Sequence, residues 1–143
     1  MDTMKARRCI AVLGAIASTC VPPAVAQTKK QVEARYSNTY NRCMNTGLAA
    51  QGVTSGIMDC SGSEIRRQDA RLNQTYTQVM ARSSPRQKTK LRASERAWIT
   101  KRDTGCQQET APLDGGTLAM ILFSGCVLDE TIRRTIWLES YNG

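Results

Sequence analysis

The cysteines carry the clearest chemical signal in this 143-residue chain, which contains no histidine. Cys43, Cys60, Cys106 and Cys126 are separated by 17, 46 and 20 positions. These spacings contain no CxxC knuckle, and the chain lacks the histidines that commonly complete zinc sites. In an exported protein, an even set of cysteines instead predicts two disulfides, which allow three pairings. We therefore expect neither a metal nor a cofactor.

A second chemical candidate is the adjacent pair Arg102 and Asp103, within residues 91–106 (LRASERAWITKRDTGC). A catalytic aspartate usually works with a second carboxylate, a histidine or a metal, and none is evident nearby. The pair could instead form salt bridges with neighbouring helices. Serine, lysine and tyrosine remain available as reactive groups, but we predict a non-enzymatic protein with no catalytic residues.

The N-terminal 26 residues have the features of a cleaved secretory signal peptide. A basic start is followed by an apolar run over residues 9–21 and by the small-x-small sequence Ala24-Val25-Ala26. Cys20 is poorly suited to lipid attachment because Thr19 precedes it. We expect a periplasmic or secreted protein without a transmembrane segment. Residues 27–143 would form one domain, with 17 basic and 11 acidic residues and a net charge of +6.

Helical periodicity runs through the mature chain. Apolar spacing predicts helices over about residues 29–46, from near residue 54 to the turn at Ser83-Ser84, and over 117–140. Ser84 as N-cap, Pro85 and Gln87 mark the start of another helix of about 20 residues, and its end is marked by Gly105 and by the loose run from Pro112 to Gly116. The predicted core residues are Leu72, Tyr76, Leu91 and Trp98.

The arrangement of these helices can be estimated by counting from the tight turn at residue 84. Cys60 and Cys106 lie 24 and 22 positions away, so they can sit at the same end of a helical hairpin, as can Cys43. Equal distance from the turn does not decide which cysteine is bonded to Cys106. On the last helix, Arg133 and Arg134 could meet an acidic side chain across an interface, with Asp69 and Asp103 as candidates. The predicted fold is a small all-α bundle of three to four helices, stapled by two disulfides.

Several motifs resemble the lysozyme inhibitor LprI-like N-terminal domains of exported bacterial proteins. The resemblance covers about residues 43–138 and rests on the four cysteines, the sequence DARLNQTY, the order Ala97-Trp98-Ile99 with Arg102-Asp103, and Gly115-Gly116-Thr117. It implies an exported helical domain and, more loosely, inhibition of lysozyme. The family supplies no catalytic residues. Its shared polar residues, Asp69, Arg102, Asp103 and Arg134, are expected to hold the fold.

One functional hypothesis is a binding protein that blocks a lysozyme or another muramidase. An inhibitor typically fills a cleft with a protruding loop, and residues 107–117 are the best candidate because cysteines flank them. Glu109 and Asp114 in this loop could approach a basic glycosidase. The net charge of +6 argues against a strongly basic animal lysozyme, so a less basic bacterial muramidase would be an easier target.

The alternative is a basic module of the cell envelope. Export makes nucleic acid an unsuitable partner, whereas anionic lipid, lipopolysaccharide or cell wall could attract a positive patch. The candidate residues surround the predicted turn and are Arg82, Arg86, Lys88, Lys90 and Arg92. The same charges could simply solubilise the protein. The sequence leaves the oligomeric state open.

Overall fold

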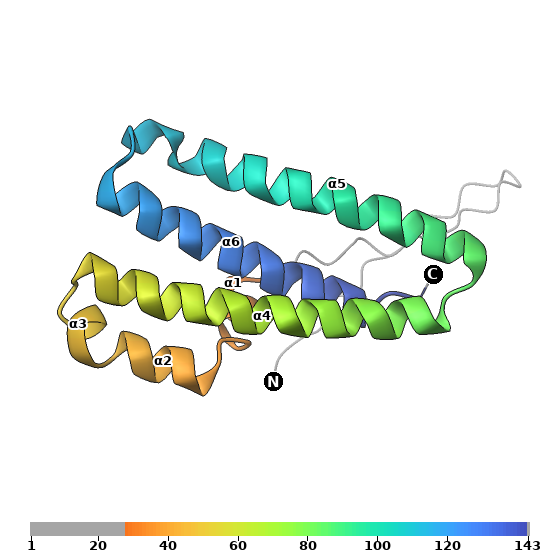
Figure 1. Cartoon of the computed structure of the whole chain (residues 1–143), viewed down its shortest axis with the longest axis horizontal. Helices are drawn as coiled ribbons and strands as arrows, with labels where there is room; N and C mark the ends of the chain where they lie inside the picture. The colour runs from red at the N-terminus through yellow and green to blue at the C-terminus, as the bar shows by residue number, and fades with distance from the viewer. Residues whose placement is uncertain (1–27, 143) are drawn as a thin grey trace, which may run out of the picture.

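Three long helices form the bundle in the computed structural model, which describes residues 28–142 (Figure 1). They are α4 (Thr54–Arg82), α5 (Pro85–Thr110) and α6 (Gly116–Glu139). Helix α6 packs closely along α4 and less extensively against α5. No strand occurs over the described range, so the predicted all-α fold is confirmed. The expected signal peptide, including Cys20, lies outside the described residues.

Three short helices precede the bundle, where the sequence predicts one helix over residues 29–46. They are α1 (Lys29–Glu33), α2 (Asn38–Met44) and α3 (Gly47–Ala50). The single-helix prediction is wrong because Ser37 leaves the helical conformation and caps α2 with its hydroxyl. Its N–H and hydroxyl donate to the Glu64 carboxylate at 2.9 and 2.6 Å. This long-range partner stabilises the break.

The turn between α4 and α5 follows the predicted local signals. The Ser84 hydroxyl accepts a hydrogen bond from the Gln87 N–H, and the Gln87 side chain accepts one from the Ser84 N–H. Pro85 occupies the first turn. Of the two predicted end signals, Gly105 is wrong, because α5 continues to Thr110; the α-helix ends just before the run that starts at Pro112, where a short 3-10 helix, η1 (Ala111–Leu113), follows. Glycine weakens a helix without necessarily ending it.

Two apolar clusters form the core. One lies near the α4–α5 turn, where Tyr76 and Trp98 pack against its buried residues. The other lies nearer the middle of α6, where the short α1 covers it. The buried residues are Leu72, Val79, Leu91 and Leu138 in the first cluster, and Val32, Leu128 and Ile132 in the second. Leu72 and Leu91 are thus buried as expected.

The two disulfides lie together at one end of the bundle. Cys43 in α2 bonds to Cys60 in α4, and Cys106 in α5 bonds to Cys126 in α6. We call residues 43–61 and 106–126 the disulfide end, and the α4–α5 turn with the last turns of α6 the hairpin end. Figure 1 shows them at opposite sides of the molecule. Counting residues from the turn correctly placed three cysteines at the same end, but neither Cys43 nor Cys60 is the partner of Cys106.

Candidate functional site

The disulfide end contains no large buried apolar side chain. Its buried residues are small, namely Ala49, Cys60, Ser61, Cys106, Ala119 and Ser124. Helix α3 approaches α4 so closely that a Cβ on Gly56 would lie 2.6 Å from the Ala49 nitrogen. Backbone contact and the two disulfides therefore hold this end in place of an apolar core.

Large apolar side chains at this end instead face the solvent. Leu118, Met120 and Leu122 on the first turns of α6 are 55%, 53% and 49% exposed. Leu48, Val53 and Leu113 are also exposed, and the remaining exposed large apolar side chain of the described chain, Ile99, lies elsewhere on α5. Concentrated exposed apolar side chains are typical of interaction surfaces.

The connection between α5 and α6 forms the tip of the disulfide end. Asp114 adopts a left-handed conformation with φ of 49°, and Gly115 and Gly116 follow with φ of 80° and 81°. The expected loop over residues 107–117 is therefore only partly a loop. Its first residues continue helix α5, so Glu109 projects from a helix, whereas Asp114 lies in the turn. Both side chains belong to exposed residues.

Acidic and basic side chains are distributed unevenly along the chain. Residues 104–132 contain four carboxylates (Glu109, Asp114, Asp129 and Glu130) and no lysine or arginine. Residues 43–65 add Asp59 and Glu64, again without a basic residue. The intervening residues 66–103 contain eleven basic and three acidic side chains. The residues of the disulfide end thus carry carboxylates and no basic side chain, although Arg42, Lys101 and Arg102 lie next to it.

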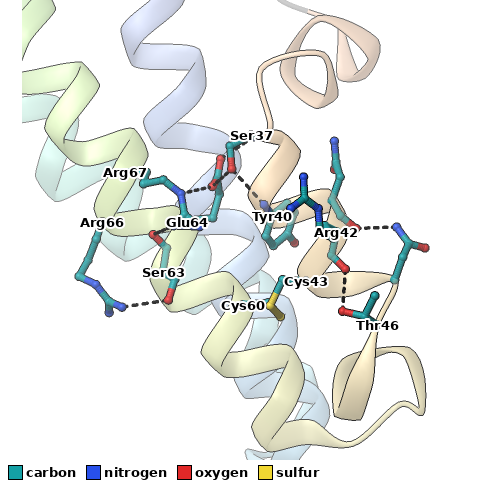
Figure 2. Close-up of a disulfide and its surroundings, with 12 residues drawn as sticks. Ser37, Tyr40, Arg42, Cys43, Thr46, Cys60, Ser63, Glu64, Arg66 and Arg67 are labelled. Atoms are coloured by element: carbon teal, nitrogen blue, oxygen red, sulfur yellow. Dashed lines mark hydrogen bonds and ion pairs between the residues drawn. A yellow bond between two sulfur atoms is a disulfide. The ribbon is translucent and has the colours of Figure 1, made fainter.

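Glu64 is a fully buried acid that the sequence interpretation missed (Figure 2). Besides Ser37, it accepts hydrogen bonds from Arg67 Nε at 3.1 Å and Gln68 Nε2 at 2.7 Å. Burial alone would raise its pKa, but the hydrogen bonds and the Arg67 charge outweigh burial and lower it. The spacing of four from Cys60 through Glu64 and Gln68 to Leu72 could have revealed this buried position. The contacts assign Glu64 a structural role.

Arg134 joins α6 to α5 through a polar contact. Its guanidinium donates to Glu95 Oε2 at 2.9 Å from Nε and to Ser94 Oγ at 3.0 Å from Nη2. The same group stacks over Trp137, 4.0 Å from the ring centroid, and lies 5.6 Å from that of Trp98. The prediction that Arg134 pairs with Asp69 or Asp103 is wrong, because Glu95 projects from the adjacent helix toward this side chain.

Those two expected partners have other neighbours. Asp69 is exposed and accepts a hydrogen bond from Asn73 at 3.2 Å. Asp103 pairs with Arg102 of the same helix, with Nε to Oδ1 at 2.8 Å, so the expected salt bridges to neighbouring helices are absent from the described contacts. Arg102 instead reaches α6 through a 3.4 Å hydrogen bond to Thr131 and stacks over Trp98. The hydrogen bond to Thr131 connects α5 to α6, and the stacking on Trp98 holds Arg102 within α5.

The candidate basic residues lie at the hairpin end and along the start of α5. Arg82 donates to the Tyr141 carbonyl oxygen at 3.2 Å. A helix advances about 100° per residue, so Arg86 and Lys90 lie on one side of α5, whereas Lys88 and Arg92 lie on another. The structure therefore does not bring all five cations to one face.

Neither a metal centre nor a membrane span is found within residues 28–142. No group of three or more potential metal-binding side chains occurs there. No helix in the same range is both long and apolar enough to cross a bilayer.

Comparison with known proteins identifies the family. The family described as lysozyme inhibitor LprI matches residues 17–138, which is most of the chain. The chain belongs to this family. It is also 31% identical over 93 residues to an uncharacterized protein of Rhizobium meliloti (strain 1021), covering 56% of this chain and 67% of that protein. No solved structure matches.

Membership of the LprI family agrees with the fold and the disulfides. The family is one of inhibitors rather than enzymes, which supports a binding role. Two disulfides together with this family indicate an extracytoplasmic protein.

Proposed function

We propose that this LprI family member is exported, after cleavage following Ala26, and inhibits a lysozyme by presenting its disulfide end to the enzyme. The observation that carries the proposal is the group of exposed apolar side chains on a backbone closed by the Cys106–Cys126 disulfide. A rigid backbone loses little conformational freedom on binding, which favours affinity. Leu118 and Leu122, which lie one turn apart on the same side of α6, would form the centre of the contact.

The division of charge supports this orientation. A net charge of +6 on the mature chain would repel a basic lysozyme at long range. The disulfide end is locally acidic, however, with Glu109 and Asp114 exposed beside the apolar side chains. A basic enzyme would therefore be steered away from the hairpin end and toward the disulfide end.

A titration of the oxidised protein against a panel of lysozymes tests the proposal. We expect stoichiometric loss of muramidase activity that survives an increase in salt, because buried apolar contacts are not screened. Leu118→Glu and Leu122→Glu should each weaken inhibition at least tenfold, because both side chains lie on the same side of α6. Ile99→Glu is the matched control, since Ile99 is 42% exposed but lies outside the disulfide end. Full activity of every lysozyme at excess protein would contradict the proposal.

A second candidate function is binding to anionic envelope components. It is favoured by one observation, namely that Arg86, Lys88, Lys90 and Arg92 form no ion pair with any described residue. Co-sedimentation with vesicles that contain anionic lipid, compared with purely zwitterionic vesicles, would test this. Binding to anionic vesicles that Lys90→Glu weakens would support it, and equal sedimentation with both vesicles would not.

A further inference from the structure

A cavity of about 440 Å³ opens beside the exposed apolar side chains of the disulfide end. It is bounded by Tyr36 before α2, by α2 itself, by α4, by the last turn of α5 and by α6 as far as Asp129. Leu122, which is half exposed, lines both the cavity and the outer surface. A partner bound to the disulfide end would therefore cover the mouth of this cavity.

The charged side chains that line the cavity are both acidic. They are Glu109 from α5 and Asp129 from α6, and no lysine or arginine lines it. In a chain with 20 basic and 12 acidic residues, an entirely acidic lining runs against the composition. The cavity therefore favours a positively charged occupant.

Hydrogen bonding orients one of these carboxylates. The Tyr36 hydroxyl donates to Asp129 Oδ1 at 2.5 Å, and burial together with this bond raises the pKa of Tyr36, which keeps it protonated as a donor. Asp129 Oδ2 accepts no hydrogen bond from a described residue, and neither does the Glu109 carboxylate. Both acids thus retain acceptors for an incoming donor.

The remaining lining suits the rest of a long cationic side chain. Tyr36 and Tyr40 meet edge to face with ring centroids 5.1 Å apart, and aromatic faces attract guanidinium and ammonium groups. Ile57 and Leu122 supply apolar surface for the methylene stem. Carboxylates, tyrosine rings and apolar side chains together match arginine or lysine better than a neutral group.

We infer that this tyrosine–carboxylate cavity binds an arginine or lysine side chain of the inhibited lysozyme and so anchors the disulfide end on the enzyme. The inference rests on the proposed function, since it names the anchor of that same contact. It also explains how a basic protein would accept a basic partner.

A small cationic probe tests the cavity without any lysozyme. Nα-acetyl-arginine methylamide would be titrated into the isotopically labelled, oxidised protein and followed by amide NMR shifts, with the citrulline analogue as the uncharged isostere. We expect saturable shifts around Tyr36, Tyr40, Glu109 and Asp129 with the arginine compound alone. Equal shifts with both compounds, or none with either, would overturn the inference.

Variants of the lining test the same cavity during inhibition. Glu109→Gln, which alters an exposed side chain, and Asp129→Asn should each weaken both probe binding and lysozyme inhibition about tenfold. Asp59→Asn is the matched control, because it removes one exposed charge from the same end without lining this cavity. Unchanged inhibition by both lining variants would overturn the inference while leaving the proposed function intact.

Failure of the proposed function gives a different result. If no lysozyme is inhibited but the arginine probe still binds at the cavity, the proposed function fails. The probe result then supports the cavity as a site for cationic side chains.

Discussion

The two ends of this bundle are held together by different means. At the hairpin end, Leu72, Val79, Leu91 and Leu138 bury an apolar cluster against which Trp98 packs. At the disulfide end, the buried side chains are small and two disulfides join the helices. Covalent bonds thus fix the end that leaves its large apolar side chains exposed. The buried cluster therefore accounts for stability at the hairpin end, and the exposed apolar side chains form the surface proposed for recognition.

A polar contact between α5 and α6 is a third means of holding the helices together, besides the apolar cluster and the disulfides. Arg134 is almost buried and is matched by Glu95, Ser94 and the Trp137 ring. A buried ion pair of this kind fixes the relative position of two helices more than it adds stability. It sets α5 at a defined position on α6, which the Cys106–Cys126 disulfide then secures at the other end.

The largest expected effect comes from the hairpin end. Leu91→Ala removes a fully buried side chain and should lower the free energy of unfolding by about 4 kcal/mol. Inhibition by the folded fraction should not change. Urea denaturation measures the first quantity and an activity titration the second. Leu118→Ala, at an exposed position, should cost less than about 0.5 kcal/mol, and a larger cost would break the contrast between the ends.

Removing the Cys106–Cys126 disulfide should affect inhibition more than Leu91→Ala does and stability less. Replacing both cysteines with serine opens a ring of about 20 residues and should cost about 3 kcal/mol of stability. Because the same ring carries Leu118, Met120 and Glu109, inhibition should fall more than tenfold even where the variant remains folded. Far-UV circular dichroism would establish the folded fraction. Full inhibition by the folded variant would show that the surface needs no covalent support.

A smaller effect is expected from the buried acid Glu64. Its lowered pKa means that the unfolded chain binds a proton more readily than the folded chain. The stabilisation is therefore complete above the usual value of 4.5 and is lost as the pH falls through the lower, folded-state pKa. Glu64→Gln should cost about 2 kcal/mol near neutral pH and remove this acid-dependent loss.

Urea denaturation at several pH values between 7 and 3 measures that effect. Glu33→Gln is the control, since Glu33 is exposed and its ion pair among residues 28–142 is the surface pair with Lys29. A Glu64→Gln variant that loses stability below pH 4.5 as steeply as the parent would contradict the role assigned to Glu64.

Local signals predicted much of this fold. Ser84, Pro85 and Gln87 mark the start of α5 because a capping box involves only neighbouring residues. The break at Ser37 was missed although it carries a local signal, since a serine can cap the helix that follows it, as Ser37 does through the Tyr40 N–H. Its second partner, Glu64, lies 27 positions away, and no local pattern records that contact.

Counting residues from a turn gives the height of a residue along the helix axis, but it does not show which side chain of a neighbouring helix that residue faces. Counting along a hairpin placed the cysteines at one end, yet it could not show that Cys106 faces Cys126. It also could not show that Arg134 faces Glu95. The acidic cavity was missed for the same reason, since Tyr36, Glu109 and Asp129 come together from three separate segments.

Hydrogen–deuterium exchange of the protein with a lysozyme that it inhibits tests the central claim most directly. The account predicts slower exchange on binding within residues 109–122, at the disulfide end, and no change within residues 82–92, at the hairpin end. Protection confined to residues 82–92 would contradict it and would assign recognition to the basic end of the molecule.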